Sequence, residues 1–319
     1  MKIVFMGSDP IALPLLNWLR QEGGGTVGFL AIYTQPDRPV GRGQRVTANA
    51  IKRWAIEHGI PVRQPVKLTQ DEREKLAHDQ PDLALVMAYG HILRDAFIET
   101  PKWGTVNLHA SILPALRGAS PIQSAIAGGG QETGVSLMRI VRELDAGPVA
   151  DVERVFIGVH DTALDIETKL ANACVPLVAR NLAALAEGRL EFVAQDSERA
   201  TFCRRLVKAD GGVDFSRPAA EVAARINGLF PWPCCRIELE GQIIKLGLAQ
   251  AVAGEGVPGK VYGHEISQLE VGTGDGRVRL LKLQRPGAKM LATADFLRGF
   301  PISDGATVAS VPMPALITR

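Results

Sequence analysis

The sequence lacks several features that mark common protein classes. Only four cysteines occur in 319 residues, and their spacing fits neither a metal motif nor a disulfide framework. No apolar run is long enough to cross a membrane. The apolar start breaks at Gly7, which predicts a first buried strand and no signal peptide. These absences favour reduced, buried thiols, no metal, no membrane and a cytoplasmic location.

Glycine-rich nucleotide motifs are also missing. The expected turn after the first strand, residues 7–10, has one glycine where a dinucleotide site would have a Gly-x-Gly-x-x-Gly series. Gly41 and Gly43 lie in a loop without the helix start that a phosphate site needs, and the three glycines at 128–130 are most simply a flexible turn. A nicotinamide-dependent enzyme is therefore disfavoured.

Charge is almost balanced, with a formal net charge of +2, but it is unevenly placed. Residues 1–199 carry 21 Lys+Arg and 23 Asp+Glu, whereas residues 200–319 carry 15 and 11. The mildly basic second part is compatible with a nucleic-acid partner but does not establish one.

The pattern along the chain predicts two domains. Short apolar runs alternate with helical periodicity in the first half, which is typical of an α/β fold with a doubly wound, mostly parallel sheet. After about residue 205, short alternating runs with glycine turns predict a small β-domain. We assign residues 1–189 to the first domain, 190–206 to a linker and 207–319 to the second domain. The expected strands of the first domain are 3–6, 28–33, 83–87, 106–109 and 135–140.

One segment holds most of the candidate chemistry. Residues 104–109 predict a strand in which Asn107 and His109 share a face, because strand side chains alternate. A helix-like stretch, a second strand and a loop containing Asp145 follow. This order predicts a crossover between two parallel strands, which would bring Asp145 to the same carboxyl edge as His109.

Each of these residues alone has a simpler structural explanation. A histidine at a strand end is often only packed and hydrogen-bonded, and Asn107 or Asp145 could serve a turn. Together, an amide, an imidazole and a carboxylate can stabilise an oxyanion, move a proton and orient the imidazole. The combination favours acyl transfer.

These residues resemble the signature of a known family. Asn107, His109, the stretch 111–114 and the loop 144–147 are similar to the folate-dependent formyltransferases. Residues 34–43, 88–90, 231–233 and 294–297 are similar to the branch that acts on methionyl-tRNA, so the resemblance covers nearly the whole chain. It implies a Rossmann-like formyltransferase fold followed by a small C-terminal OB-like β-barrel that binds tRNA.

The resemblance also implies a reaction and a site. The enzyme would transfer the formyl group of 10-formyltetrahydrofolate to the α-amino group of methionine on initiator tRNA, for translation initiation. It would act as a monomer, without a metal. The resemblance assigns catalysis to Asn107, His109 and Asp145. The residues that it assigns to folate binding are Ala88, Tyr89, Gly90, Ser111, Ile112, Leu113 and Pro114. Arg38, Arg42 and Arg45 would contact the acceptor end of the tRNA.

Alternatives stay open at this point. By composition alone, the arginine-rich loop is most simply a solvated basic loop. The same chemistry could serve a nucleotide sugar, another small amine, or water in formyl-folate hydrolysis, and a catalytically silent tRNA-binding protein is a further possibility. The chain also departs from the family pattern. Ala115 and Leu116 precede Arg117, residues 141–143 and 146–148 differ from the usual residues on the two sides of Leu144 and Asp145, and Gln44 stands where lysine is frequent.

Overall fold

The computed structural model describes residues 1–23, 25–40, 43–263, 267–303 and 305–319. It divides the chain into two compact units. The first unit holds residues 1–117, 134–155 and 168–200, and the second holds 118–133, 156–167 and 201–319. The second unit therefore takes in two segments that precede residue 168. The domain boundaries at 189 and 207 stay predictions.

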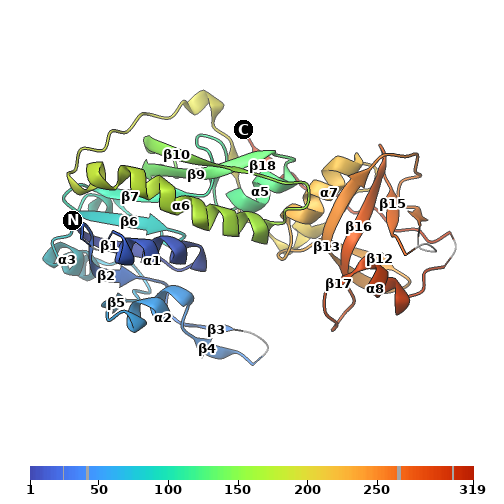
Figure 1. Ribbon diagram of the computed structural model, residues 1–319, viewed down its shortest axis with the longest axis horizontal. Helices are drawn as coiled ribbons and strands as arrows, with labels where there is room; N and C mark the ends of the chain where they lie inside the picture. The colour runs from blue at the N-terminus through green and yellow to red at the C-terminus, as the bar shows by residue number, and fades with distance from the viewer. Residues whose placement is uncertain (24, 41–42, 264–266, 304) are drawn as a thin grey trace. The chain divides into compact units, whose positions relative to one another are not determined.

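The first unit is built on a seven-stranded sheet in the order β10-β9-β7-β6-β1-β2-β5 (Figure 1). The strands from β7 to β5 pair in parallel, which confirms the mostly parallel α/β fold. The strands are β1 (Lys2–Gly7), β2 (Gly28–Tyr33), β5 (Val62–Arg63), β6 (Leu83–Met87), β7 (Thr105–His109), β9 (Glu132–Arg139) and β10 (Val149–Phe156).

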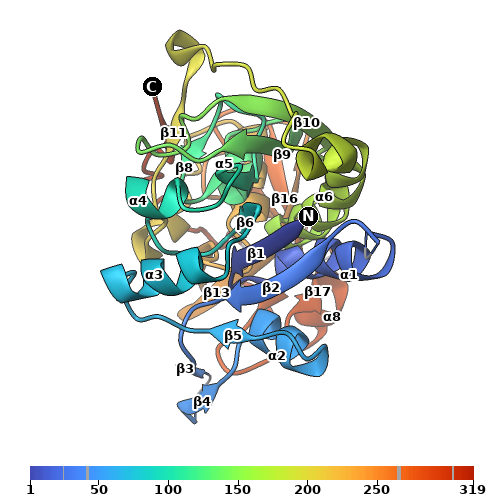
Figure 2. The same cartoon turned by 90° about the vertical axis from the view of Figure 1, so that its left-hand side faces the viewer.

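Helices cover both faces of this sheet. Figure 2 shows α3 and α4 on one side of it and α1 and α6 on the other. On the first side, Val4 and Val86 of the sheet belong to one buried cluster with Leu76 of α3 and Phe97 of α4. The helices are η1 (Pro10–Ala12), α1 (Leu13–Gln21), α2 (Ala50–Glu57), α3 (Gln70–His78), α4 (Asp95–Ile98), α6 (Ala163–Ala186) and η2 (Ser197–Arg199).

The predicted parallel crossover after β7 is wrong. β9 pairs with β7 in the antiparallel direction, with Leu137 opposite Leu108 and Ser136 opposite His109. A parallel return needs a connecting helix that packs on the sheet. The intervening helix, α5 (Pro121–Ala127), belongs instead to the second unit, where the backbone of Gly228 packs against Ala127. β9 therefore runs back alongside β7.

The arginine-rich loop after β2 contains a short hairpin. β3 (Arg38–Val40) pairs with β4 (Arg45–Thr47) in the antiparallel direction. Its base is fixed by Asn49, whose amide nitrogen donates to the Thr34 hydroxyl at 2.9 Å and to the Gln35 carbonyl at 3.2 Å. The sequence predicts no strand here, because the residues of β4 are all exposed and have no buried face to create an alternating pattern.

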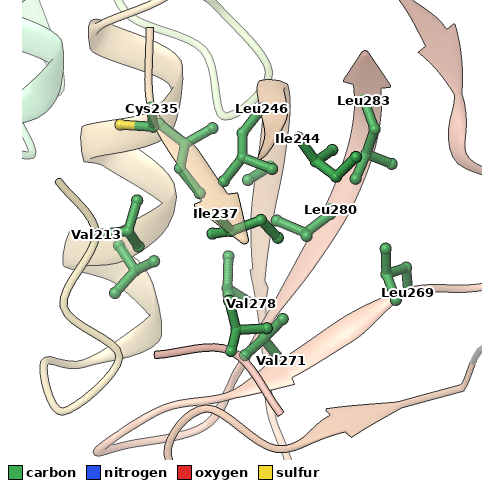
Figure 3. Packing of buried hydrophobic residues seen from close by; sticks show 14 of the residues in the cluster. Val213, Cys235, Ile237, Ile244, Leu246, Leu269, Val271, Val278, Leu280 and Leu283 are labelled. Carbon is green, nitrogen blue, oxygen red and sulfur yellow. The ribbon is translucent and has the colours of Figure 1, made fainter. Parts of the chain in front are cut away.

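The second unit contains an antiparallel sheet in the order β12-β13-β16-β15-β14, with β17 beside β16. Figure 3 shows its core, where Ile244, Leu246, Val278 and Leu280 pack together. This confirms a C-terminal β-domain, while closure into an OB-like barrel stays a prediction. The remaining elements are β8 (Arg117–Gly118), α5, β11 (Phe202–Cys203), η3 (Lys208–Gly211), α7 (Ala219–Gly228), β12 (Arg236–Leu239), β13 (Gln242–Val252), β14 (Val261–Tyr262), β15 (Glu270–Gly272), β16 (Arg277–Gln284), β17 (Leu291–Ala292), α8 (Thr293–Arg298) and β18 (Ile317–Thr318).

Two expectations from the composition can be compared with the structure. All four cysteines are free and buried, as the sequence predicts. Burial raises the pKa of the Cys174 and Cys235 thiols to about 12, so neither forms a thiolate near neutral pH. Across the described ranges, no helix is both long enough and apolar enough to cross a membrane.

A buried carboxylate fixes the start of the second unit. The Asp210 side chain is 0% exposed and accepts hydrogen bonds from Arg204, at 2.5 and 2.9 Å, and from the Val207 N–H at 2.7 Å. Burial alone would raise the pKa of this carboxyl. The hydrogen bonds from Arg204 and Val207, with the positive charges of Arg204 and Arg225, outweigh burial and hold the pKa below its ordinary value.

We expect Asp210→Asn to destabilise the protein by roughly 2 kcal/mol near neutral pH, because it removes the charge of a buried carboxylate that accepts hydrogen bonds from Arg204 and Val207. A lowered native pKa stabilises the fold above the unfolded pKa of about 3.9, and this contribution is lost as pH falls through the native value. Urea unfolding curves of the variant and the wild type should therefore converge as pH falls through the native pKa of Asp210, which lies below its ordinary value. Asp295→Asn is the matched control; its exposed pair with Arg298 should contribute under about 1 kcal/mol. A difference in unfolding free energy between variant and wild type that is the same at every pH would contradict a lowered pKa of Asp210.

Candidate active site

The site is built on β7, the strand between β6 and β9. Asn107 lies opposite Val86 of β6 and Met138 of β9, and His109 lies opposite Ser136 of β9. Because strand side chains alternate, Asn107 and His109 project from the same face of the sheet. This is the face of Val86, which belongs to the cluster covered by α3 and α4.

The His109 imidazole is buried and faces an oxygen at each nitrogen. The ring is 6% exposed. Its Nε2 lies 3.0 Å from the Leu116 carbonyl, which can only accept, so Nε2 carries a hydrogen. Its Nδ1 lies 3.7 Å from Oδ1 of Asp145. The carboxylate of Asp145 therefore faces the ring nitrogen that does not contact Leu116.

Asp145 reaches His109 from the loop after β9, despite the antiparallel direction of that strand. The loop lies on the face of the sheet that α4 covers, where Arg142 is 3.8 Å from Asp95 of α4. Asp145 itself has a φ of +52°, a left-handed conformation that is unfavourable for a residue with a side chain. The sequence correctly predicts that Asp145 lies beside His109, although the parallel crossover on which that prediction is based is wrong.

Two side-chain amide hydrogen bonds fix this loop. Gln195 Nε2 donates to the Asp145 carbonyl at 2.8 Å and to the Gly147 carbonyl at 2.7 Å. Gly147 itself packs tightly on β9, since a Cβ there would lie 2.0 Å from the Arg139 carbonyl oxygen. The loop backbone is thereby held on both sides of the Asp145 side chain.

The side-chain amide of Asn107, unlike the imidazole of His109, is available to bind a ligand. The residue is half-buried, and its side-chain amide makes no hydrogen bond to any residue that the structure describes. A half-buried amide beside an imidazole can donate to an oxygen that becomes negative during a reaction. Asn107, His109 and Asp145 thus bring an amide, an imidazole and a carboxylate together at the end of β7.

The segment 111–114 follows β7 and is held by Ser136. The Ser136 hydroxyl donates to the Ser111 carbonyl at 2.7 Å and accepts from the Leu113 N–H at 3.1 Å. The Ser111 hydroxyl donates to the Ala115 carbonyl at 2.6 Å. These bonds turn the chain sharply at the end of the strand and place residues 111–114 at the carboxyl edge of the sheet.

Residues 88–90 form the neighbouring turn at the same edge, because β6 and β7 are adjacent and parallel. Ala88 and Gly90 both have positive φ, +48° and +79°. The Tyr89 carbonyl accepts from the Ser8 hydroxyl and from Gln35 Nε2, each at 3.2 Å. The Tyr89 ring is buried, and burial raises the pKa of its hydroxyl. The two turns predicted to bind folate thus lie side by side.

Two of the predicted tRNA contacts, Arg38 and Arg45, lie on the β3–β4 hairpin. Arg38 and Arg45 are both exposed, and Arg42 lies outside the described residues. Arg38 Nη2 donates to Gln35 Oε1 at 2.8 Å, and the same Gln35 amide donates to the Tyr89 carbonyl. One side chain therefore connects the base of the hairpin with the turn after β6.

Comparison with known proteins identifies the family. A family model for formyl transferases matches residues 1–180, and a model for the C-terminal domain of formyl transferases matches residues 205–301. Methionyl-tRNA formyltransferase of Methylococcus capsulatus is 38% identical over 95% of this chain and 98% of its own length. That of Myxococcus xanthus is 40% identical over 95% and 96%. The chain belongs to the methionyl-tRNA formyltransferase family.

Solved structures show that the fold extends beyond this family. The N-formyltransferase from Helicobacter canadensis, in complex with folinic acid and dTDP-3-aminofucose, has a TM-score of 0.67 at 18% identity. The match covers 89% of this chain and 99% of that one. HypX from Aquifex aeolicus, in complex with tetrahydrofolic acid, has a TM-score of 0.60 at 17% identity and is covered over 47% of its length. At these identities the likeness establishes the fold alone.

Three residues that organise the site were not among those predicted from the sequence. Gln195 fixes the Asp145 loop, Ser136 fixes the segment after β7, and Gln35 joins the hairpin to the turn after β6. Ser136 could have been found, because it is a polar residue in the middle of a strand that is otherwise mostly apolar and buried. Gln195 carries no such signal, since it lies in a stretch without periodicity.

If these three residues form the catalytic site, Asn107→Ala, His109→Ala and Asp145→Asn should each lower the rate of formyl transfer by roughly 100-fold or more, because each would remove a group that acts on the reacting atoms. Single-turnover formylation measures this directly. His78→Ala, at an exposed histidine of α3, is the control and should keep the wild-type rate. A variant with a native-like circular dichroism spectrum that keeps more than about a tenth of the activity would remove that residue from the mechanism.

Proposed function

We propose that this chain transfers the formyl group of 10-formyltetrahydrofolate to the α-amino group of methionine on initiator tRNA. The observation that carries the proposal is the identity of 38–40% with methionyl-tRNA formyltransferases along almost the full length of both chains. The placement of Asp145 beside His109 on the strand of Asn107 supports it, because an amide, an imidazole and a carboxylate suit formyl transfer.

The proposed roles follow from the geometry of these side chains. The methionine nitrogen attacks the formyl carbon, the bond from that carbon to the folate nitrogen breaks, and the proton lost by the amine passes to the departing nitrogen. Asn107 would donate to the formyl oxygen as it becomes negative. His109 would carry the proton at Nδ1, and Asp145 would orient the ring and stabilise its charged form.

The carboxyl edge of the sheet suits a folate. The turns at 88–90 and 111–114 are adjacent, and their backbone is fixed by hydrogen bonds from Ser8, Gln35 and Ser136. A folate bound there would lie beside the end of β7, next to His109. Formyl-folate supplies an activated one-carbon group, and the protein supplies position, an oxyanion donor and a proton carrier.

The β3–β4 hairpin would contact the tRNA. Arg38 and Arg45 are exposed cations on a short projecting element, which is suited to phosphates or to the bases of a single-stranded end. The hydrogen bond from Arg38 to Gln35 fixes the hairpin close to the proposed folate edge. An acceptor end held by the hairpin would thus lie near the site of transfer. We also propose that the enzyme is cytoplasmic and acts as a monomer.

We expect the double variant Arg38→Ala/Arg45→Ala to raise KM for methionyl-tRNA about 10-fold and to leave formyl-folate binding unchanged, because exposed cations serve the RNA. The slope of the logarithm of the tRNA binding constant against the logarithm of salt concentration should also become less steep by about two. Formylation kinetics and a folate titration at several salt concentrations measure both. Arg20→Ala, at an exposed arginine of α1, is the control for charge.

The same assay separates the alternatives. Wild-type protein is incubated with formyl-folate and either methionyl-tRNA, a dTDP-amino sugar or water alone. Faster formylation of the sugar than of methionyl-tRNA would overturn the proposed acceptor. Release of formate without an acceptor would identify a hydrolase, and tRNA binding without transfer would identify a silent binding protein.

A further inference from the structure

The Asp145 loop has a support that the proposed mechanism does not use. Arg117 donates from Nε and Nη2 to Gln195 Oε1, at 3.0 and 2.8 Å. The other end of the same amide donates to the Asp145 and Gly147 carbonyls. We call this pair the Arg117–Gln195 bridge. Arg117 is 5% exposed, so its guanidinium is fixed by packing as well as by hydrogen bonds.

The bridge joins the two segments that hold the imidazole. The Leu116 carbonyl accepts from His109 Nε2, and Leu116 is followed directly by Arg117. Asp145 lies on the other side of the ring, at Nδ1. A closed circuit therefore runs from His109 through Leu116, Arg117, Gln195 and Asp145 back to His109.

The Arg117–Gln195 bridge is anchored at its far end as well. Two residues before Gln195, the backbone of Val193 exchanges two hydrogen bonds of 2.9 Å with Val149 at the start of β10. Gln195 is half-buried, although Val193 is 74% exposed. The amide of Gln195 thus extends inward from a segment that is itself fixed to the edge of the sheet.

The chemistry of the bridge needs an amide. One end must accept from a guanidinium and the other must donate to two carbonyl oxygens, and a carboxylate has no hydrogen to donate. Donation from Arg117 polarises the amide and strengthens the bonds to the loop. Those bonds hold Asp145 in its left-handed conformation, with φ of +52°.

We propose that Gln195 and Arg117 are positioning residues that set the separation between Asp145 and His109. The inference rests on the proposed function, in which the carboxylate orients the imidazole. Without the bridge, the loop would relax from its unfavourable conformation and the carboxylate would move away from Nδ1. Misplacement of a catalytic group by about 1 Å can cost up to about 100-fold in rate.

We expect Gln195→Ala to lower kcat between about 10- and 100-fold, with KM for formyl-folate and for methionyl-tRNA within about 3-fold of wild type. Gln195→Glu should be as damaging, because it keeps an acceptor for Arg117 but loses both donors to the loop. Gln70→Ala, at an exposed glutamine of α3, is the matched control and should keep the wild-type kcat.

A double-mutant cycle with Asp145→Asn tests whether Gln195 acts through the carboxylate. Once the charge is removed, adding Gln195→Ala should cost less than about 3-fold more. An equal loss in both backgrounds would show that Gln195 acts elsewhere and would overturn the proposal. So would a Gln195→Glu variant with the wild-type kcat.

Hydrogen exchange of residues 141–148 gives a readout that does not need the reaction. In Gln195→Ala these amides should exchange faster than in the wild type, whereas those of β6 should not change. Identical exchange in both proteins would mean that the Arg117–Gln195 bridge does not hold the loop. If the wild type failed to formylate methionyl-tRNA, the proposed function would fall, but this measurement would still decide whether the bridge fixes the loop.

Discussion

The position of β7 between two hydrogen-bonded neighbours is the constraint on which the site depends. β6 pairs with one edge of this strand and β9 with the other, so its backbone has no room to shift. The separation of Asn107 and His109 is then set by the two-residue repeat of the strand. In the proposed function, the oxyanion donor and the proton carrier would therefore be in place before any substrate arrives, which is the condition under which electrostatic stabilisation is most effective.

The strand pairing that positions Asn107 and His109 does not position Asp145. Asp145 lies in an irregular loop with a positive φ, where no ladder of backbone hydrogen bonds fixes its position. Its placement depends on individual contacts, from Gln195 to two carbonyls and from Gly147 to β9. The sheet therefore fixes Asn107 and His109, whereas side-chain contacts fix the loop that carries Asp145. Changes at these side-chain contacts need not disturb the fold.

This difference explains what the sequence could predict. Strands such as β2 and β6 follow from short-range patterns, and the family resemblance predicts a site at Asn107, His109 and Asp145, which stays a prediction. Alternation does not, however, reveal in which direction a strand runs. The direction of β9 is set by its pairing with β7, which lies about thirty residues earlier in the chain and is therefore not a local property of the strand. The β3–β4 hairpin and Gln195 were missed because exposed residues and single polar contacts leave no periodic signal.

Two glutamines in this unit have the same physical arrangement. Gln35 accepts from Arg38 and donates to the Tyr89 carbonyl, as Gln195 accepts from Arg117 and donates to the Asp145 carbonyl. A glutamate could hold either arginine but would place a negative charge against the backbone carbonyl and offset the charge of the guanidinium. A neutral amide joins the cation to the backbone and leaves its charge intact. At Arg38 this matters most, because an exposed cation that is not neutralised can still attract a phosphate.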